Sequence, residues 1–242
     1  MLVLPFDAHN HIHMGPSEPT VALAGDDHHH RLGGLALMST HTRDFEQVLQ
    51  LSESLPLHSC NKDANNVSDQ TNERNLIVVP GFGIHPWWLA ELSDEQWAPS
   101  PRHDTTVGND DPAFAQPPQW LDQMETLLLD HPHSIVGEIG LDGFHFDPDT
   151  RDLVCPMETQ VVAFEWQMQL AARLQRPVSI HTVQCFGPLM KSLSKLKQQK
   201  QLPPRMYFHA FGGKVGTVDQ LLALCGRKLG VVYFGFAPVI SK

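Results

Sequence analysis

The residues best suited to chemistry near the N-terminus are two histidines in the segment Asp7-Ala-His9-Asn-His11, which follows the apolar run at 2–6. In an extended chain, side chains two positions apart point to the same face, so His9 and His11 at the end of a strand can direct two imidazoles at one ion. Neutral imidazole is the commonest metal ligand, and Asp7 could orient one of the rings. The alternative is a solvated turn, since 15 histidines in the chain make chance pairs common.

Further polar residues follow apolar runs later in the chain. Glu138 lies in Ile135-Val136-Gly137-Glu138-Ile139-Gly140-Leu141-Asp142, where flanking glycines allow close approach and the carboxylate could bridge two metals. His181 ends the run Val178-Ser179-Ile180-His181, and His209 ends Met206-Tyr207-Phe208-His209. A single histidine at a strand end usually serves packing or a turn. Histidines and a glutamate at successive strand ends together predict a metal site.

The elements that must position these residues alternate along the chain. Strands are expected near 2–6, 35–39, 76–81, 134–139, 177–181, 205–209 and 230–234. Amphipathic helices are expected at 43–55, 119–130, 158–175, 187–200 and 215–225. Pro177 should end the third of these near Arg176, because the residue before a proline avoids helical geometry. The alternation predicts an α/β fold with parallel crossovers, and so many units favour a (β/α) barrel over an open sheet.

Length and composition fit one barrel domain spanning residues 1–242, because such barrels use about 250 residues. Three stretches, 14–34, 58–75 and 99–118, are expected to be loop insertions. The triplet at 28–30 is three histidines, for which a solvated loop is favoured over weak metal binding.

The sequence also bears on the compartment. No apolar run approaches the length of about 18 residues needed to span a membrane, and the N-terminus lacks a secretory signal. We therefore expect a cytoplasmic or nuclear protein with no membrane partner. Its cysteines have no Cys-x-x-Cys spacing, which fits reduced thiols; they are Cys60, Cys155, Cys185 and Cys225.

The net charge of −10 is unevenly distributed. Residues 1–170 carry 6 Lys and Arg against 26 Asp and Glu, whereas residues 171–242 carry 11 against 1. An acidic chain is a poor general binder of nucleic acid, because binding needs clustered cations. The lysines of 187–200 could face phosphate, although the solvated side of one helix explains them more simply.

Taken together, these motifs resemble the TatD family of metal-dependent deoxyribonucleases, within the amidohydrolase-like barrels. The matching pieces run in the family's order: Asp7-x-His9-x-His11, Gly83-Ile84-His85-Pro86, Gly137-Glu138-Ile139-Gly140-Leu141-Asp142, the helix with Gln160, Phe164 and Gln167 that leads into Pro177-Val178-Ser179-Ile180-His181, and His209-Ala210-Phe211-Gly212-Gly213. The first motif alone is shared with many metallohydrolases, but its combination with the second and third is specific.

The resemblance implies a two-metal site. His9 and His11 would hold one divalent cation, and Glu138 would bridge it to a second held by His181 and His209. The implied reaction is hydrolysis of phosphodiester bonds in DNA, or alternatively RNA. Two cations about 3.5–4 Å apart suit that role, since they stabilise the attacking and leaving oxygens.

Other roles are less defined. His85 is expected to pack beside the site, and Asp142 is either a partner that orients a ligand or a cap for its loop. The substrate-binding residues are unknown. Imidazole-rich ligands favour zinc or manganese by softness, whereas the resemblance suggests magnesium, so the cation is Mg, Zn or Mn.

Two departures from the family pattern stand out. The family continues into an eighth strand that ends in Thr-Asp-x-Pro, whose aspartate completes the first metal site and is assigned the proton-transfer role. The last aspartate here is Asp219, within a predicted helix. We therefore expect a (β/α)8-type TIM barrel with the eighth strand missing from this chain, which leaves the first and seventh strands as edges. The second departure is Val183, where many members have a phosphate-binding arginine; Thr182 or Gln184 could replace that contact more weakly.

Three functions stay open at this point. The first is a TatD-like nuclease in which Glu138 is the central residue. The second is another metal-dependent hydrolase, acting on an ester, lactone or amide. The third is a catalytically inactive, metal-binding paralogue that works through protein contacts.

Overall fold

The computed structural model of the chain describes residues 6–11, 34–54, 77–100, 117–226 and 230–236. Its strands are β1 (Phe6–Asn10), β2 (Gly34–Met38), β3 (Ile77–Phe82), β4 (Ile135–Asp142), β5 (Val178–Val183), β6 (Arg205–Phe208) and β7 (Val231–Phe234). Its helices are η2 (Thr42–Asp44), α2 (Phe45–Ser54), η3 (Pro86–Glu91), α3 (Asp94–Trp97), α4 (Gln119–Asp130), α5 (Met157–Arg173), α6 (Phe186–Gln198) and α7 (Val215–Cys225).

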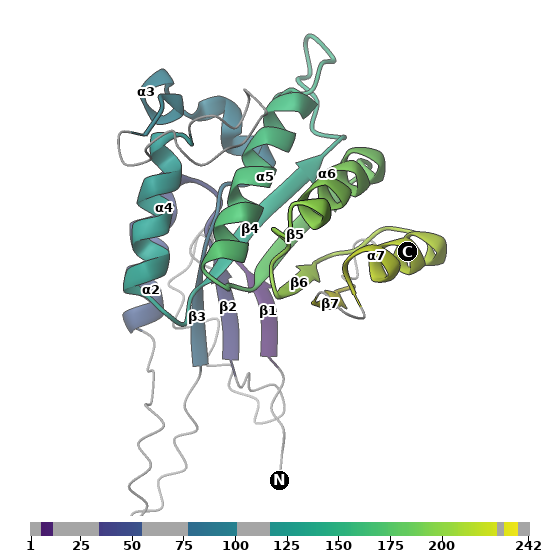
Figure 1. Cartoon of the computed structure of the whole chain (residues 1–242). Coiled ribbons are helices and arrows are strands. Elements are labelled where there is room, and N and C mark those ends of the chain that lie inside the picture. The colour runs from purple at the N-terminus through teal and green to yellow at the C-terminus, as the bar shows by residue number, and fades with distance from the viewer. Residues whose placement is uncertain (1–5, 12–33, 55–76, 101–116, 227–229, 237–242) are drawn as a thin grey trace, which may run out of the picture.

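The seven strands form one parallel sheet whose spatial order follows the chain order from β1 to β7. Because each right-handed crossover advances in the same direction, the helices lie on one side of the sheet, as in a (β/α) barrel. Figure 1 shows α4, α5 and α6 outside the curved sheet. The expected barrel architecture is confirmed. Within the described residues, β1 and β7 are the two ends of the strand order.

Most predicted elements are found with bounds shifted by one to a few residues. The first strand is expected near 2–6, of which residues 2–5 lie outside the described part of the chain; β1 spans Phe6–Asn10, so His9 lies within the strand itself. Helix α5 ends at Arg173, and Gln175 then adopts a left-handed conformation with φ 55° ahead of Pro177. The sequence pattern missed η3 and α3, because a short turn carries too few residues to show a helical period.

The three predicted insertions lie almost entirely outside the described residues, as do the histidine triplet at 28–30 and Cys60. Their described edges are ordered: Gly34 opens β2, and Pro99 pairs with Pro118 in an isolated antiparallel bridge. Cys155, Cys185 and Cys225 are free thiols, as the spacing predicted. None of the helices in the described ranges is both long and apolar enough to cross a membrane.

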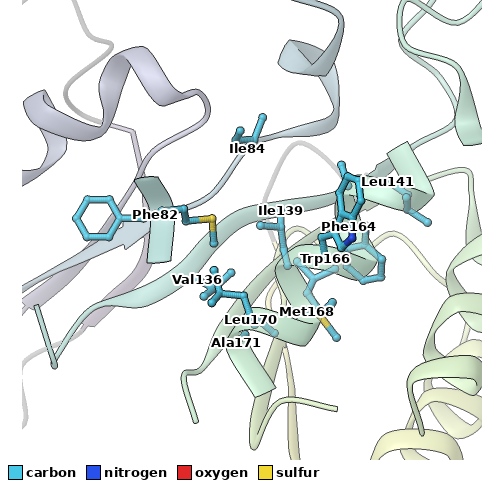
Figure 2. Close-up of a cluster of buried hydrophobic side chains, with 14 of the residues drawn as sticks. Phe82, Ile84, Val136, Ile139, Leu141, Phe164, Trp166, Met168, Leu170 and Ala171 are labelled. Atoms are coloured by element: carbon cyan, nitrogen blue, oxygen red, sulfur yellow. The ribbon is translucent and has the colours of Figure 1, made fainter. Parts of the chain in front are cut away.

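The main core lies between the sheet and the helices, and α5 packs directly on β4. Figure 2 shows this region, where Val136, Ile139 and Leu141 of β4 meet Phe164 and Met168 of α5. An unbroken strand would place residues 136 and 139 on opposite faces. The register with β5 shifts between Val136 and Ile139, so both side chains join the core.

Side chains along β5 and β6 alternate between the two faces of the sheet, so the core residues and the site residues lie on opposite faces. Val178 and Ile180 are buried in the core, as are Met206 and Phe208. The intervening positions therefore point to the other face of the sheet. On that face a cavity of about 410 Å³ is lined in part by Ser179, Tyr207 and Tyr233. The histidines at the ends of β5 and β6 share this face.

Candidate metal centre

The carboxylate of Glu138 is the centre of the site and contacts four of the predicted histidines. Its Oε2 lies 2.8 Å from Nε2 of His11 and 3.3 Å from Nε2 of His9. Its Oε1 lies 2.6 Å from Nε2 of His209 and 3.2 Å from Nδ1 of His181. The structure thus brings all five predicted residues together, and each carboxylate oxygen faces a different pair of imidazoles.

The tautomer of His11 is determined by its surroundings. Its Nδ1 donates to the backbone carbonyl of Met38 at 2.9 Å, and a carbonyl can only accept. In the neutral ring, Nε2 therefore carries a lone pair, and this atom lies 3.0 Å from Nε2 of His9 and next to Glu138. Such an arrangement of lone pairs and a carboxylate fits a shared cation.

Ser179 links two histidines from strands far apart in the sheet order, His9 on β1 and His209 directly after β6. Its Oγ lies 3.0 Å from Nδ1 of His9 and 3.2 Å from Nδ1 of His209. The two rings stack with centroids 3.7 Å apart. If both rings are to present an Nε2 lone pair, both Nδ1 atoms must be protonated and must donate to this one hydroxyl oxygen.

Asp142 both orients a histidine and caps its loop, so neither of its two expected roles excludes the other. Its Oδ2 accepts from Nε2 of His181 at 2.9 Å and from Nε1 of Trp87 at 2.8 Å. Its Oδ1 accepts from the backbone amides of Phe144 and His145 at 2.7 and 3.0 Å. Because the carboxylate holds the Nε2 proton, His181 presents Nδ1 to Glu138.

His85 is buried beside the same carboxylate, and its Nε2 lies 3.5 Å from Oε1 of Glu138. Its Nδ1 accepts from the amide of Trp87 at 3.2 Å, where it caps η3. The neutral ring therefore carries its proton on Nε2 and offers a hydrogen bond toward Glu138. This geometry agrees with the expected packing role.

Ligand atoms also cluster tightly enough for cations. Within the described part of the chain, two groups each bring one potential ligand atom per residue within 4.8 Å of one another: His9, Glu138 and His209, and His85, Glu138 and His181. The donor set, with imidazoles oriented by a carbonyl, a hydroxyl and a carboxylate, fits divalent cations.

Burial and charge act in opposite directions on the two carboxylates. Burial favours a raised pKa for Glu138, but the surrounding imidazoles of His85, His209, His11 and His181 outweigh it and hold the pKa well below its usual value. Burial also works against ionisation of Asp142, but hydrogen bonds lower its pKa to about 2. Both carboxylates are therefore charged at neutral pH.

Four histidines of the site, His11, His85, His181 and His209, have shifted pKa values, two of them raised and two lowered. For His181, the carboxylates of Asp142 and Glu138 outweigh burial and raise the pKa to about 9. For His11, contacts with Glu138 and Met38 also outweigh burial and raise the pKa. Burial dominates at the other two positions and lowers the pKa of His85 to about 3 and of His209 to about 4.

The other residues that the sequence suggested as phosphate contacts differ in their surroundings. Thr182, suggested as a phosphate contact, is buried and its Oγ1 lies 3.5 Å from Sγ of Cys185, whereas Gln184 is exposed. Helix α6 packs against α5 and α7, and its Lys195 pairs with Glu165 at 3.0 Å. The lysines of α6 therefore belong to the outer helical layer. The side chain of Asp7 lies outside what the structure describes.

Sequence reasoning missed Ser179 and Trp87 as parts of the site. Ser179 precedes His181 by two positions, so strand alternation alone places it on the same face. Trp87 follows His85 by two positions, but only the fold brings its indole to Asp142.

Comparison with known proteins identifies the family of the chain. A model of the family described as TatD related DNase matches residues 6–242. The Cut9-interacting protein scn1 of Schizosaccharomyces pombe is 25% identical over an alignment 246 residues long, and this alignment covers 79% of this chain and 68% of that protein. The putative deoxyribonuclease TATDN3 of Mus musculus is 28% identical over 208 residues, which cover 86% of this chain and 54% of that protein.

Solved structures agree on the fold. The chain is similar to YJJV, a TatD homologue from Escherichia coli, with a TM-score of 0.60 and 24% identity, and it covers 65% of that protein. It is also similar to an amidohydrolase from Saccharomyces cerevisiae, with a TM-score of 0.58 and 16% identity. With a family match over nearly its whole length, the chain belongs to the TatD-related DNase family.

Proposed function

We propose that this chain is a metal-dependent hydrolase of phosphodiester bonds in DNA, with Glu138 bridging two divalent cations. The observation that carries the proposal is the division of the Glu138 carboxylate between two pairs of imidazoles. One oxygen faces His9 and His11, and the other faces His181 and His209. A carboxylate whose two oxygens face different pairs of ligands is suited to bridging two cations.

Each histidine of these pairs has a neighbour that could fix its free nitrogen. The backbone carbonyl of Met38 lies beside His11, and the carboxylate of Asp142 lies beside His181. The hydroxyl of Ser179 lies beside both His9 and His209. When bound, paired divalent cations supply positive charge at a phosphodiester and lower the pKa of a water molecule. His85 would contribute a neutral hydrogen-bond donor beside them.

The family and its relatives support DNA as the substrate class. The mouse relative is described as a putative deoxyribonuclease, and the chain spans about half to two thirds of the length of the relatives it matches. We infer DNA as the substrate, and a single metallohydrolase domain over residues 1–242. Mg, Zn and Mn are the candidate cations, of which Zn and Mn suit the imidazole donors better.

The test is hydrolysis of single-stranded DNA labelled at either end, with the purified chain loaded in turn with Mg²⁺, Mn²⁺ or Zn²⁺. Glu138→Gln keeps the shape of the side chain but removes the charge, so cleavage should fall to the metal-free background. Glu91→Gln is the matched control, because Glu91 is a surface residue paired with Arg43.

Three outcomes would contradict the proposal. Cleavage of RNA alone would change the substrate class. Turnover of small esters or amides without DNA cleavage would indicate a different hydrolase. Metal binding without turnover of any of these substrates would indicate the inactive paralogue.

A further inference from the structure

Three large aromatic side chains are exposed beside the metal centre. Trp87 is 40% exposed, Phe144 is 59% exposed and Phe146 is 45% exposed. We call these residues the aromatic rim. Two of them contact Asp142 directly, Trp87 through its indole Nε1 and Phe144 through its backbone amide. The rim therefore lies one residue away from His181, whose ring Asp142 also holds.

Two residues of the rim, Phe144 and Phe146, lie on the loop between β4 and α5. Phe146 pairs with Leu153 in an isolated antiparallel bridge, and the Asp147 carboxylate accepts from the amides of Asp149 and Thr150 at 2.9 and 2.8 Å. In Figure 1 this connection projects beyond the carboxyl end of β4. The rings of Phe144 and Phe146 meet edge to face with centroids 5.9 Å apart.

The neighbouring ring of Trp87 is also held in place. Its face stacks on His145, with centroids 4.5 Å apart and an interplanar angle of 17°, while its indole nitrogen donates to Asp142. Exposed aromatic side chains fixed at a site lose little conformational freedom when a ligand stacks on them. Single exposed apolar residues are common on protein surfaces, but exposed aromatic side chains clustered beside a charged site are typical of a ligand-binding surface.

We propose that Phe144 and Phe146 form a platform on which unpaired nucleobases stack beside the metal centre. This proposal rests on the proposed function. Nucleobases fit because every base offers a flat face to an aromatic side chain. The loop also carries Asp147, Asp149 and Asp152 against Arg151, an acidic excess that disfavours an anionic membrane as the partner of this surface.

The test compares Phe144→Leu with the unchanged protein on two oligonucleotides. One is a natural single strand, and the other is identical except that its terminal nucleotides are abasic. Fluorescence anisotropy measures binding, and end-labelled cleavage measures kcat/KM. Leucine keeps most of the apolar volume but has no ring, so the affinity for the natural strand should fall about 5- to 150-fold. The affinity for the abasic strand should not change.

Leu129→Ala is a control for loss of exposed apolar area, because Leu129 is 55% exposed on α4. Phe146→Leu should repeat the loss on the natural strand, and Phe144→Trp should retain binding.

The result separates the two proposals. If no metal supports cleavage but anisotropy still distinguishes the strands in this pattern, the platform stands while the nuclease proposal fails. If cleavage occurs but Phe144→Leu affects both strands equally, the platform is wrong. The platform also fails if Phe144→Leu leaves DNA binding intact and instead abolishes a concentration-dependent dimer, because the rim would then be a contact between copies of this chain.

Discussion

Removal of the Ser179 hydroxyl should weaken the binding of both cations at once. In Ser179→Ala the Nδ1 atoms of His9 and His209 lose the oxygen that lies 3.0 and 3.2 Å away. Loss of an orienting partner typically lowers metal affinity about 10- to 100-fold. Since the proposed pairs place His9 with one cation and His209 with the other, we expect a loss in this range for each. The loss of these hydrogen bonds from Ser179 should also lower the folding stability by about 1–3 kcal/mol.

Isothermal titration with Mn²⁺ or Zn²⁺ measures both affinities, and elemental analysis measures the stoichiometry. Ser52→Ala is the matched control, because Ser52 is equally buried but its hydroxyl donates to the carbonyl of Leu49 within α2. Thermal unfolding of the metal-free variants separates a loss of stability from a loss of affinity. Unchanged affinities would refute a hydroxyl shared by the two histidines. A loss confined to one cation would instead refute the proposed pairs and place His9 and His209 on the same cation.

The other predictions concern the same centre. In titration calorimetry, Asp142→Asn should lower the affinity for the cation near His181 about 10- to 100-fold and leave the affinity for the other cation nearly unchanged. An equal loss of affinity for both cations would contradict the geometry. Because His181 has a pKa of about 9 in the metal-free protein, cation binding must displace its proton. The affinity for this cation should therefore rise about tenfold per pH unit from pH 7 to 9. An affinity that does not change with pH would exclude that displacement. The stability of the metal-free fold should change with pH in the opposite direction. The raised pKa of His181 stabilises the fold fully below pH 6.5, and this contribution is lost as the pH rises through 9. Denaturant unfolding of the metal-free protein at each pH measures this change. Gly140→Ala should destabilise the fold by about 2 kcal/mol or more in chemical denaturation. The reason is that φ at Gly140 is 152° and that a Cβ there would meet the backbone carbonyl of His181. An unchanged stability would show that the strand can shift to make room.

Much of the fold could be read from local patterns. Alternating apolar runs and amphipathic stretches predicted the strands and the longer helices, since both periods depend on residues close in the chain. The strand-end positions of His181 and His209 followed from the same patterns, as did the need for glycine beside Glu138. A Cβ at Gly137 would lie 3.0 Å from Cβ of Ser179, which shows that the predicted close approach is real.

The sequence could not give the orientation of Glu138. Strand alternation counted from Val136 would turn its side chain into the helical core, but the register shift between Val136 and Ile139 allows it to face the histidines. Such irregularities depend on pairing with a neighbouring strand, and β5 begins some forty residues later in the chain. The period of a single strand does not contain that information.

The sequence by itself determined which residue types are available, the order of the elements that carry them, and the family to which the chain belongs. Only the tertiary structure decided which oxygen of Glu138 faces which imidazoles, and that Ser179 serves two rings while Asp142 serves a ring, an indole and a loop. The physical reason is distance along the chain: His11 and Glu138 are 127 residues apart, and His9 and Ser179 are 170 apart. Hydrogen bonds between such residues form only when folding brings the strand ends to one edge of the sheet.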